Sequence, residues 1–183
     1  MAPEGESQDQ LPWALIGAGP TGLSAARNLS RRGIPFVGFE IHTDVGGLWD
    51  IESEKSTMYE SAHLISSKTT TAYDEFPMRD EVADFPSHWE MNSYFKDYAD
   101  TFDLRRNFRF GTEVTAAEPE DPESESSVWK VTIRNEDGEE ESGRYAGAAI
   151  GVKDDETQLK GTAVDAAYTV NNSTVAEVDI RLS

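Results

Sequence analysis

The chain has 183 residues, enough for one ordinary globular domain with a buried core, and it contains no cysteine. Disulfides, thiolate nucleophiles, cysteine-ligated zinc and iron–sulfur clusters are therefore excluded. Its 35 acidic and 16 basic residues give a net charge of −19, and such a surface repels both nucleic acid and anionic membranes.

The acidity has two open interpretations. It provides solubility through self-repulsion, or it reflects adaptation to high salt, where the repulsion between carboxylates is screened. The first residues lack the basic and apolar regions of a secretory signal, and no run approaches the ~18 apolar residues of a membrane span. We therefore expect a cytoplasmic protein with neither nucleic acid nor membrane as partner.

The first part of the chain predicts a strand–helix–strand unit after an acidic, disordered lead-in over 1–11. Residues 13–16 form an apolar run typical of a buried strand, and 35–40 predict a second strand. Between them, 21–30 predict a helix, because Leu23, Ala26 and Leu29 recur on one face and Gly33 follows as a stop signal. The unit is expected to be a right-handed crossover with parallel strands.

The middle of the chain is expected to hold one long loop region and one clear helix. Residues 41–90 have little periodicity, and loops of such length are usually functional. An amphipathic helix is predicted from Met91 to Phe102, where aromatic residues recur at helical spacing and pack in the core. Residues 107–114 alternate like a strand.

The last third predicts antiparallel structure. An acidic surface loop is expected over 118–126, a strand over 128–134, a turn at 135–138 and a returning strand over 144–150. After residue 151 the sequence becomes polar, and its alternation predicts a terminal hairpin over 167–182.

The most informative segment is ALIGAGPTGLSAARNL, residues 14–29, in which Gly17, Gly19 and Gly22 match G-x-G-x-x-G. The first glycine of this pattern makes a tight turn, the second lets the backbone approach a pyrophosphate, and the third lets helix and strand pack closely. The diphosphate lies at the helix N-terminus, where free N–H groups and the helix dipole favour an anion. A bare match is weak, but this one joins a predicted strand to a predicted helix. It therefore predicts a dinucleotide site.

An acidic residue ends the second predicted strand. Glu40 lies 18 residues beyond Gly22, close to the ~20 expected for a carboxylate that binds a ribose hydroxyl. Such an acid fits FAD or NAD and disfavours a 2′-phosphate, because two anions would be opposed. The GGLWD segment at 46–50 favours FAD, since its glycines allow close approach and Leu48 and Trp49 can lie against a flavin ring. Taken alone, Trp49 is more often a core residue.

Several segments occur in the order seen in flavin-containing monooxygenases, and from about residue 12 to 151 the chain resembles the N-terminal part of that family. They are GAGPTGLSAARNL, Glu40, GGLW, YESAHLISSKTTTAYDEFPM, DFPSHWEMNSYFKDYADTFDL and RFGTEV. The resemblance implies an FAD-dependent oxidoreductase. In the family, NADPH reduces the flavin, O2 gives a C4a-hydroperoxyflavin, and that species oxygenates a soft nitrogen, a sulfur or a ketone.

The resemblance also implies cofactor contacts residue by residue. The glycine turn would hold the diphosphate, Glu40 the ribose, and the backbone near Val114 the adenine. Lys68 has two open interpretations, a residue near flavin or NADPH phosphate and a solvated loop lysine. The implied cofactor-binding residues are Gly17, Ala18, Gly19, Pro20, Thr21, Gly22, Glu40, Gly47, Leu48, Trp49, Ser66, Lys68 and Val114.

The sequence departs from the family pattern at two places. A family asparagine that meets flavin and nicotinamide falls on Ile65, which cannot hydrogen-bond the flavin, so Ser66 and Ser67 are the nearby polar substitutes. Ile65 and Ser66 are placed near the reacting end of the cofactor, and no catalytic residue is assigned. The family's second glycine turn, which binds NADPH, has no counterpart, so a truncated or remodelled member with a divergent tail over 152–183 is expected.

Together these features predict an α/β fold. We expect a Rossmann-type FAD-binding domain with a parallel sheet over 12–151 and a small antiparallel hairpin or meander insert over about 115–144. FAD is the expected cofactor, and NADPH is implied by the family although its binding domain is not found. Two alternatives stay open. One is an FAD-binding module without independent catalysis, and the other is a cofactor-free domain that associates with itself or with a complementing chain.

No metal site is predicted. His42, His63 and His88 are scattered and have no acidic residue at ligand spacing. Neighbouring acidic residues at 74–75 and 80–81 arise by chance in a chain with 35 of them, and they carry no prediction of glycoside chemistry.

Overall fold

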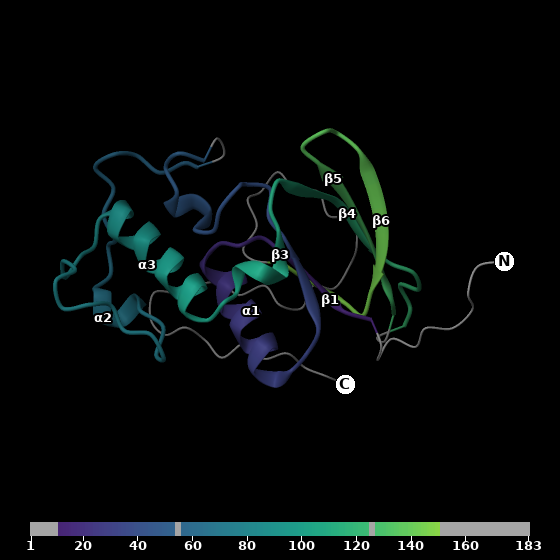
Figure 1. Cartoon of the computed structure of the whole chain (residues 1–183), viewed down its shortest axis with the longest axis horizontal. Helices are drawn as coiled ribbons and strands as arrows, with labels where there is room; N and C mark the ends of the chain where they lie inside the picture. The colour runs from purple at the N-terminus through teal and green to yellow at the C-terminus, as the bar shows by residue number, and fades with distance from the viewer. Residues whose placement is uncertain (1–10, 54–55, 125–126, 151–183) are drawn as a thin grey trace.

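The computed structural model describes residues 11–53, 56–124 and 127–150, which form two sheets and the helices packed on them. The parallel sheet has the strand order β3-β2-β1-β7 and the antiparallel sheet the order β4-β5-β6. Figure 1 shows the antiparallel sheet at one end of the molecule and α2 with α3 at the other. The parallel strands are β1 (Trp13–Ile16), β2 (Phe36–Phe39), β3 (Phe108–Arg109) and β7 (Ala148–Ile150). The predicted α/β class with a parallel sheet and an antiparallel insert is confirmed.

The predicted strand–helix–strand unit is present. Helix α1 (Pro20–Arg32) connects β1 to β2, which lie parallel with Trp13 opposite Phe36. The helix ends where Gly33 adopts a left-handed conformation with φ +67° and donates its N–H to the carbonyl of Ser30. Leu23, Ala26 and Leu29 are buried along one face, as their spacing predicts.

Helix α3 (His88–Thr101) starts three residues earlier than predicted. Its first turn is closed by a capping box, in which the Ser87 side chain accepts the backbone N–H of Glu90 and the Glu90 carboxylate accepts the backbone N–H of Ser87. Residues 41–90 are otherwise loops, as expected, interrupted by the short helices η2 (Gly47–Trp49) and α2 (Lys68–Thr71). A further short helix, η3 (Arg105–Asn107), precedes β3.

Two of the expected strands are each divided between the two sheets. The segment 107–114 contains β3 and the start of β4 (Thr112–Pro119), separated by Gly111 with φ +60°. The segment 144–150 contains the end of β6 (Glu140–Tyr145) and all of β7. The prediction of a single strand in each segment was wrong. Alternation of apolar and polar residues indicates an extended backbone, but it does not indicate which sheet the backbone joins. The expected acidic loop starts inside β4, and the expected hairpin over 167–182 lies outside the described residues.

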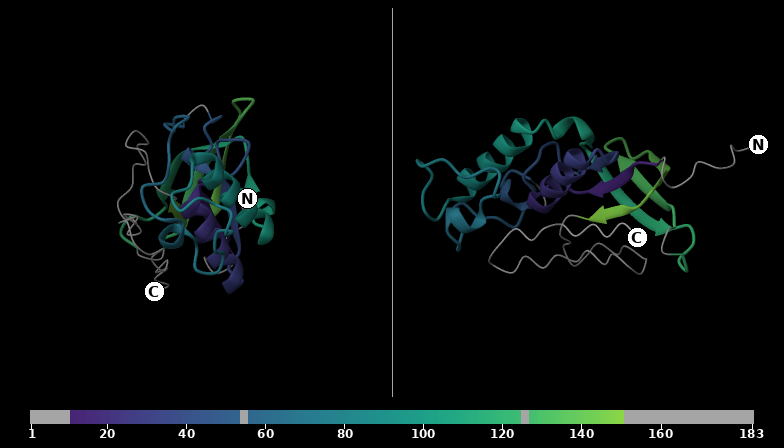
Figure 2. Two further views of the ribbon diagram at one scale, coloured as in Figure 1. Left: turned by 90° about the vertical axis from the view of Figure 1, so that its left-hand side faces the viewer. Right: turned by 90° about the horizontal axis from the view of Figure 1, so that it is seen from below.

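Two hydrophobic cores lie on opposite faces of the parallel sheet. Leu15 of β1 packs with α1 and α3 in the larger core, whereas its neighbour Ala14 packs with Val131 and Ile133 of β5 (Trp129–Asn135) in the smaller one. This period of two is that of a strand buried on both faces. Figure 2 shows the resulting elongated shape, with the antiparallel strands and α3 at opposite ends. Among the described helices, none has the length and apolar character that crossing a bilayer requires.

Candidate functional site

The glycine turn joins β1 to α1 in a conformation that needs glycine. Gly17 has φ +93°, which L side chains rarely adopt, and its N–H donates to the carbonyl of Phe39 at 2.8 Å. A Cβ at Gly22 would lie 2.0 Å from the carbonyl oxygen of Gly17, so the helix and the turn touch directly. Gly19 is the N-cap, and no side chain caps α1 there. The first-turn N–H groups are therefore available to an anion.

Glu40 points its carboxylate at this turn from the end of β2. The side chain is only 5% exposed. One carboxylate oxygen accepts the N–H of Ala18 at 2.5 Å, and the other accepts the N–H of His42 at 2.9 Å. These bonds satisfy a buried charge and fix its position. A carboxylate has about four lone-pair sites, so acceptor capacity remains for a ligand hydroxyl.

The Gly46–Trp49 segment lies across the glycine turn. Gly46 has φ +124° and donates its N–H to the carbonyl of Ala18 at 3.1 Å. A Cβ at Gly47 would lie 2.9 Å from the Cα of Gly19, so the two backbones pass at a distance that only glycine allows. Leu48 is 51% exposed, while Trp49 is half-buried against the larger core. The structure thus brings the glycine turn, Glu40 and this segment together.

Asn92 of α3, for which the sequence predicted no role, lies against the same segment. It is 6% exposed, and its Oδ1 has no hydrogen-bond partner among the described residues. A Cβ at Gly46 would lie 2.4 Å from that oxygen. The spacing of Asn92 among the buried positions of α3 was readable from the sequence, but its facing Gly46 depends on the tertiary fold.

An aromatic cluster contacts the first residue of α1. The Tyr73 hydroxyl donates to the carbonyl of Pro20 at 2.5 Å, and the Tyr73 ring lies 4.3 Å, centroid to centroid, from that of Tyr98. The Tyr94 hydroxyl donates to the carbonyl of Phe76. Burial raises the pKa of Tyr94 to about 12 and raises the pKa of Tyr73 well above its usual value, so both hydroxyls stay protonated as donors. The predicted core role of the aromatic residues of α3 agrees with their burial.

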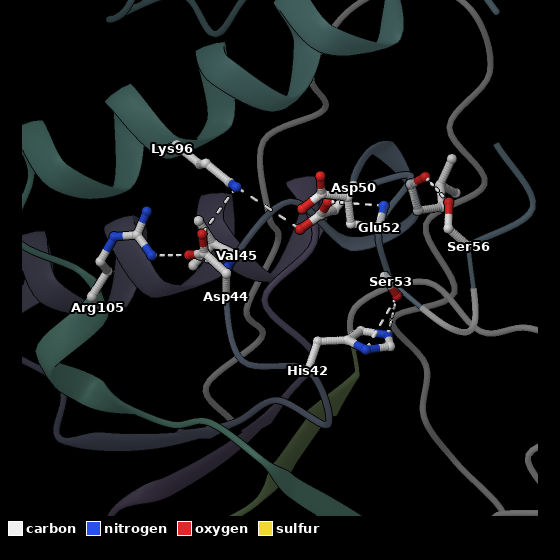
Figure 3. A network of polar contacts seen from close by, with 10 residues as sticks. His42, Asp44, Val45, Asp50, Glu52, Ser53, Ser56, Lys96 and Arg105 are labelled. Atoms are coloured by element: carbon white, nitrogen blue, oxygen red, sulfur yellow. Dashed lines mark hydrogen bonds and ion pairs between the residues drawn. The ribbon is translucent and has the colours of Figure 1, made fainter. Parts of the chain in front are cut away.

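A network of charged side chains fixes the residues that flank the Gly46–Trp49 segment (Figure 3). Asp44 pairs with Lys96 of α3 at 3.0 Å and with Arg105 of η3. Partial burial disfavours the ionised form, but the hydrogen bonds from Arg105 and Lys96 outweigh it and lower the pKa of the Asp44 carboxyl. Asp50, at the far end of the segment, lies 3.9 Å from the Lys96 ammonium. In a chain so rich in acidic residues, no sequence signal distinguished Asp44.

Ile65 and Ser66 make their contacts away from the glycine turn. The chain just before them pairs with the residue that precedes α3, through an isolated bridge from His63 to Ser87. Ile65 is 84% exposed, and the Ser66 hydroxyl shares a hydrogen bond with that of Thr71 at 2.7 Å. The described structure gives these residues no hydrogen bond to the turn, so their predicted role near the flavin stays a prediction.

The Lys68 ammonium donates hydrogen bonds to backbone carbonyl groups of a neighbouring loop. It donates to the carbonyl oxygens of Val82 at 2.6 Å, Asp80 at 3.0 Å and Arg79 at 3.4 Å. Three such bonds use the donors of an ammonium group. The loop that contains these carbonyls is thereby closed on α2.

Val114 follows two residues after Thr112, whose backbone is hydrogen-bonded to that of Glu40. The N–H of Thr112 donates to the carbonyl of Glu40 at 2.9 Å, and Val114 follows two residues along β4, opposite Ile133. The pairing register shifts directly after Val114, which is a bulge in the strand. A bulge frees backbone groups from the ladder, as contact with a ligand through the backbone would require.

Two surface hollows of about 430 and 400 Å³ lie along α3, and neither is lined by the glycine turn. Ser93 and Asp97 line both. Within the described ranges, no group of three or more histidine, aspartate or glutamate side chains is placed to hold a metal ion. The glycine turn, Glu40 and the Gly46–Trp49 segment therefore form the best-defined candidate site.

Comparison with known proteins identifies the family of this chain. A family model described as flavin-binding monooxygenase-like matches residues 12–150. The curated relatives include Flavin-containing monooxygenase FMO GS-OX5 of Arabidopsis thaliana, 35% identical over 161 residues, covering 75% of this chain and 34% of the relative. Flavin-containing monooxygenase 5 of Homo sapiens is 30% identical over 141 residues, covering 75% and 26%. The chain spans about a third or less of the length of these relatives.

Solved structures agree with the family match. A steroid monooxygenase bound to NADP superposes with a TM-score of 0.59 at 27% identity, covering 77% of this chain and 25% of that one. OTEMO in complex with FAD and NADP gives a TM-score of 0.63 at 30% identity, covering 80% and 26%. The S-allyl-L-cysteine S-oxygenase of Allium sativum shares the fold, with a TM-score of 0.67 at 22% identity, covering 76% and 36%. The chain belongs to the flavin-binding monooxygenase-like family.

Proposed function

We propose that the described domain binds FAD. The observation that carries the proposal is the buried Glu40 carboxylate, which contacts the Ala18 N–H of the glycine turn at 2.5 Å. This contact puts an acceptor for ribose hydroxyls beside a helix N-terminus suited to a diphosphate, which is the pairing that a dinucleotide requires. The residues fit the cofactor in another respect, because no Cβ at Gly17, Gly19 or Gly22 blocks approach to the backbone.

The segment beyond Glu40 supports FAD over NAD. Gly47 brings the Gly46–Trp49 backbone against Gly19, and the neighbouring residue Leu48 is 51% exposed. An exposed aliphatic side chain next to a diphosphate site suits an aromatic ring system of a ligand. We assign the flavin end of the cofactor to this side, and the adenine end to the side of Val114 and β4.

Bound FAD supplies the redox and oxygen chemistry, while the chain binds, orients and shields it. In our proposal α1 binds the diphosphate through its N–H groups and Glu40 binds the ribose. The Gly46–Trp49 segment covers the turn and limits access of water. No side chain of the described residues is assigned a nucleophilic or acid–base role.

For the whole protein we propose oxygenation of a soft nitrogen or sulfur centre, or of a ketone, driven by NADPH and O2. The support is the family and the names of the relatives, which are monooxygenases. The sequence contains one G-x-G-x-x-G turn, and the proposal assigns it to FAD. We therefore place the NADPH site outside the described residues, and the alternative is an FAD-binding module that has no catalysis of its own.

The test is cofactor retention by the purified chain with two glycine variants. Gly17→Ala and Gly138→Ala both put alanine at a positive φ, +93° and +82°, where strain costs about 1–2 kcal/mol, but only Gly17 is in the turn. We expect the wild-type chain and Gly138→Ala to retain the visible flavin band through gel filtration, and Gly17→Ala to lose it. Retention of FAD by Gly17→Ala would place the cofactor elsewhere. A wild-type chain that binds NAD in preference to FAD would refute the cofactor assignment.

Addition of NADPH to the flavin-loaded chain separates the catalytic proposal from its alternative. Bleaching of the flavin band under nitrogen, followed by its return with oxygen, is expected of a complete oxidoreductase. A band that NADPH leaves unchanged but dithionite bleaches identifies an FAD-binding module.

A further inference from the structure

Asp44, two residues before the Gly46–Trp49 segment, accepts three donors: the N–H of the next residue and two side-chain cations from distant parts of the chain (Figure 3). One Asp44 carboxylate oxygen accepts its neighbour's N–H, that of Val45, at 2.7 Å, and also the guanidinium of Arg105. The other accepts the Lys96 ammonium at 3.0 Å. Asp44 therefore connects the segment at once to α3 and to η3.

The two cations are themselves fixed. The Arg105 guanidinium also donates to Asp100 at 2.5 Å, which joins η3 to the end of α3. The Lys96 ammonium lies 3.9 Å from Asp50, so one ammonium reaches both ends of the segment. Asp44, Lys96 and Arg105 each leave about a third of the side chain exposed, so water screens these pairs less than it screens pairs on the open surface.

The segment between Asp44 and Asp50 needs such an anchor. Two consecutive glycines, Gly46 and Gly47, have φ of +124° and +59°, and glycine allows the backbone many other conformations. On the side of the glycine turn, one backbone hydrogen bond, from Gly46 to Ala18, holds the segment. Val45 is completely buried and adds a contact with the core. Further along the segment, the Ser56 hydroxyl donates to the carbonyl of Leu48 at 2.6 Å and Trp49 packs on the larger core. Asp44 is the charged anchor on the N-terminal side of the two glycines.

We propose that Asp44 is a positioning residue, which holds the Gly46–Trp49 segment across the glycine turn through Lys96 and Arg105 and thereby slows release of the cofactor. Asp44 acts on the backbone of the segment and does not touch the cofactor. The inference rests on the proposed FAD site, and it names a residue that neither the glycine motif nor the ribose acid includes.

The variant Asp44→Asn tests this, because it keeps the shape and one acceptor but removes the charge that both cations share. Asp103→Asn is the matched control. Asp103 pairs with Arg106 at 2.9 Å on the open surface, with both side chains about two-thirds or more exposed, and asparagine tolerates its φ of +52°. Asp44→Glu, which restores the charge, is the rescue variant.

Amide hydrogen exchange in the cofactor-free chain is the first measurement. We expect the Gly46 N–H to exchange about tenfold faster in Asp44→Asn, because a charge-assisted anchor is lost. The Leu23 N–H, bonded to the carbonyl of Gly19 at 2.9 Å, is expected to keep its wild-type rate. Asp103→Asn should change neither amide. Equal acceleration at Gly46 and Leu23 would mean a general loss of stability and would overturn the positioning role, as would no change at Gly46.

The rate of FAD release is the second measurement, made by dilution of the loaded protein well below its unfolding temperature. We expect release about tenfold faster from Asp44→Asn, wild-type release from Asp103→Asn, and at least partial recovery in Asp44→Glu. Faster exchange at Gly46 without faster release would show that the anchor does not serve the cofactor. A wild-type chain that binds no FAD would refute the proposed function, whereas the exchange measurement would still decide whether Asp44 holds the segment.

Discussion

Gly22 offers the sharpest test of how the glycine turn is built. Gly22→Ala places a methyl carbon 2.0 Å from the carbonyl oxygen of Gly17 and 2.9 Å from its carbonyl carbon. Carbon–oxygen contacts in proteins lie at roughly 3.3 Å or more, so α1 and the turn must separate by about 1.3 Å. Both partners are backbone, and no side-chain rotation can absorb the clash.

The expected cost follows from two opposing terms. Overpacking typically lowers the free energy of unfolding by about 1–3 kcal/mol, and we take about 3 kcal/mol here because no side chain can move to relieve the clash. Alanine gains about 1 kcal/mol over glycine inside a helix, which leaves a net loss of about 2 kcal/mol in the free energy of unfolding. For a domain of this size, that loss lowers Tm by about 4–8 °C. Displacement of two first-turn N–H groups, as charge-assisted donors to the diphosphate, weakens FAD binding by roughly 100-fold.

Gly33→Ala is the control at the other end of the same helix. Gly33 has φ +67° with no atom within 4 Å of an added Cβ, so the variant costs about 1 kcal/mol in backbone strain and lowers Tm by about 2–4 °C. We expect its FAD affinity to equal that of the wild type. Thermal unfolding of the cofactor-free chains and FAD titrations measure both effects. If Gly22→Ala matches Gly33→Ala in both Tm and affinity, the close packing of helix and turn is not what the site requires.

Three further predictions concern charged side chains of the described structure. Glu40→Gln should lower stability by about 1–3 kcal/mol in urea unfolding, because an amide nitrogen would face a backbone N–H of Ala18 or His42 and leave it unpaired; an unchanged midpoint would contradict the buried contact. Lys68→Met should speed tryptic cleavage at Arg79, because three hydrogen bonds to carbonyl groups of that loop are lost. It should leave FAD affinity unchanged, and loss of FAD binding would mean that Lys68 contacts the cofactor. The pKa values of Asp44 and Glu75 are lowered, because hydrogen bonds from arginine or lysine partners outweigh desolvation. The stability they contribute is present above the ordinary carboxyl range and is lost as pH falls through the lowered pKa values, so urea unfolding of Asp44→Asn should depend less on pH in the acid range than that of the wild type.

The parts of the site that local sequence determines were predictable. The strand, glycine turn and helix around Gly17 follow from spacing alone, and the contact of Glu40 with the turn follows from the parallel crossover. The start of α3 was also readable, because Ser87 and Glu90 form the S-x-x-E signature of a capping box, although the aromatic periodicity from Met91 drew the prediction three residues too late.

The parts that depend on distant segments were not predictable. Gly111 and Gly147 lie where the chain leaves one sheet for the other, yet in sequence they look like glycines inside strands. Asp44 could not be distinguished from other acidic residues, because its partners Lys96 and Arg105 are more than fifty residues away in sequence. The Lys68 ammonium donates to backbone carbonyl groups, and every residue has such a group, so the pattern of side chains could not predict these contacts.

The strand order has a consequence for how the site is assembled in time. β1 carries the glycine turn and is flanked by β2, which follows within 25 residues, and by β7, which the chain reaches only at Ala148. Closing so long a loop is slow compared with local pairing, because its entropy must be lost before the contact forms. On the ribosome, β1 therefore keeps one edge unpaired while the whole antiparallel sheet is synthesised. Cofactor capture by the nascent chain should begin only after β7 has emerged.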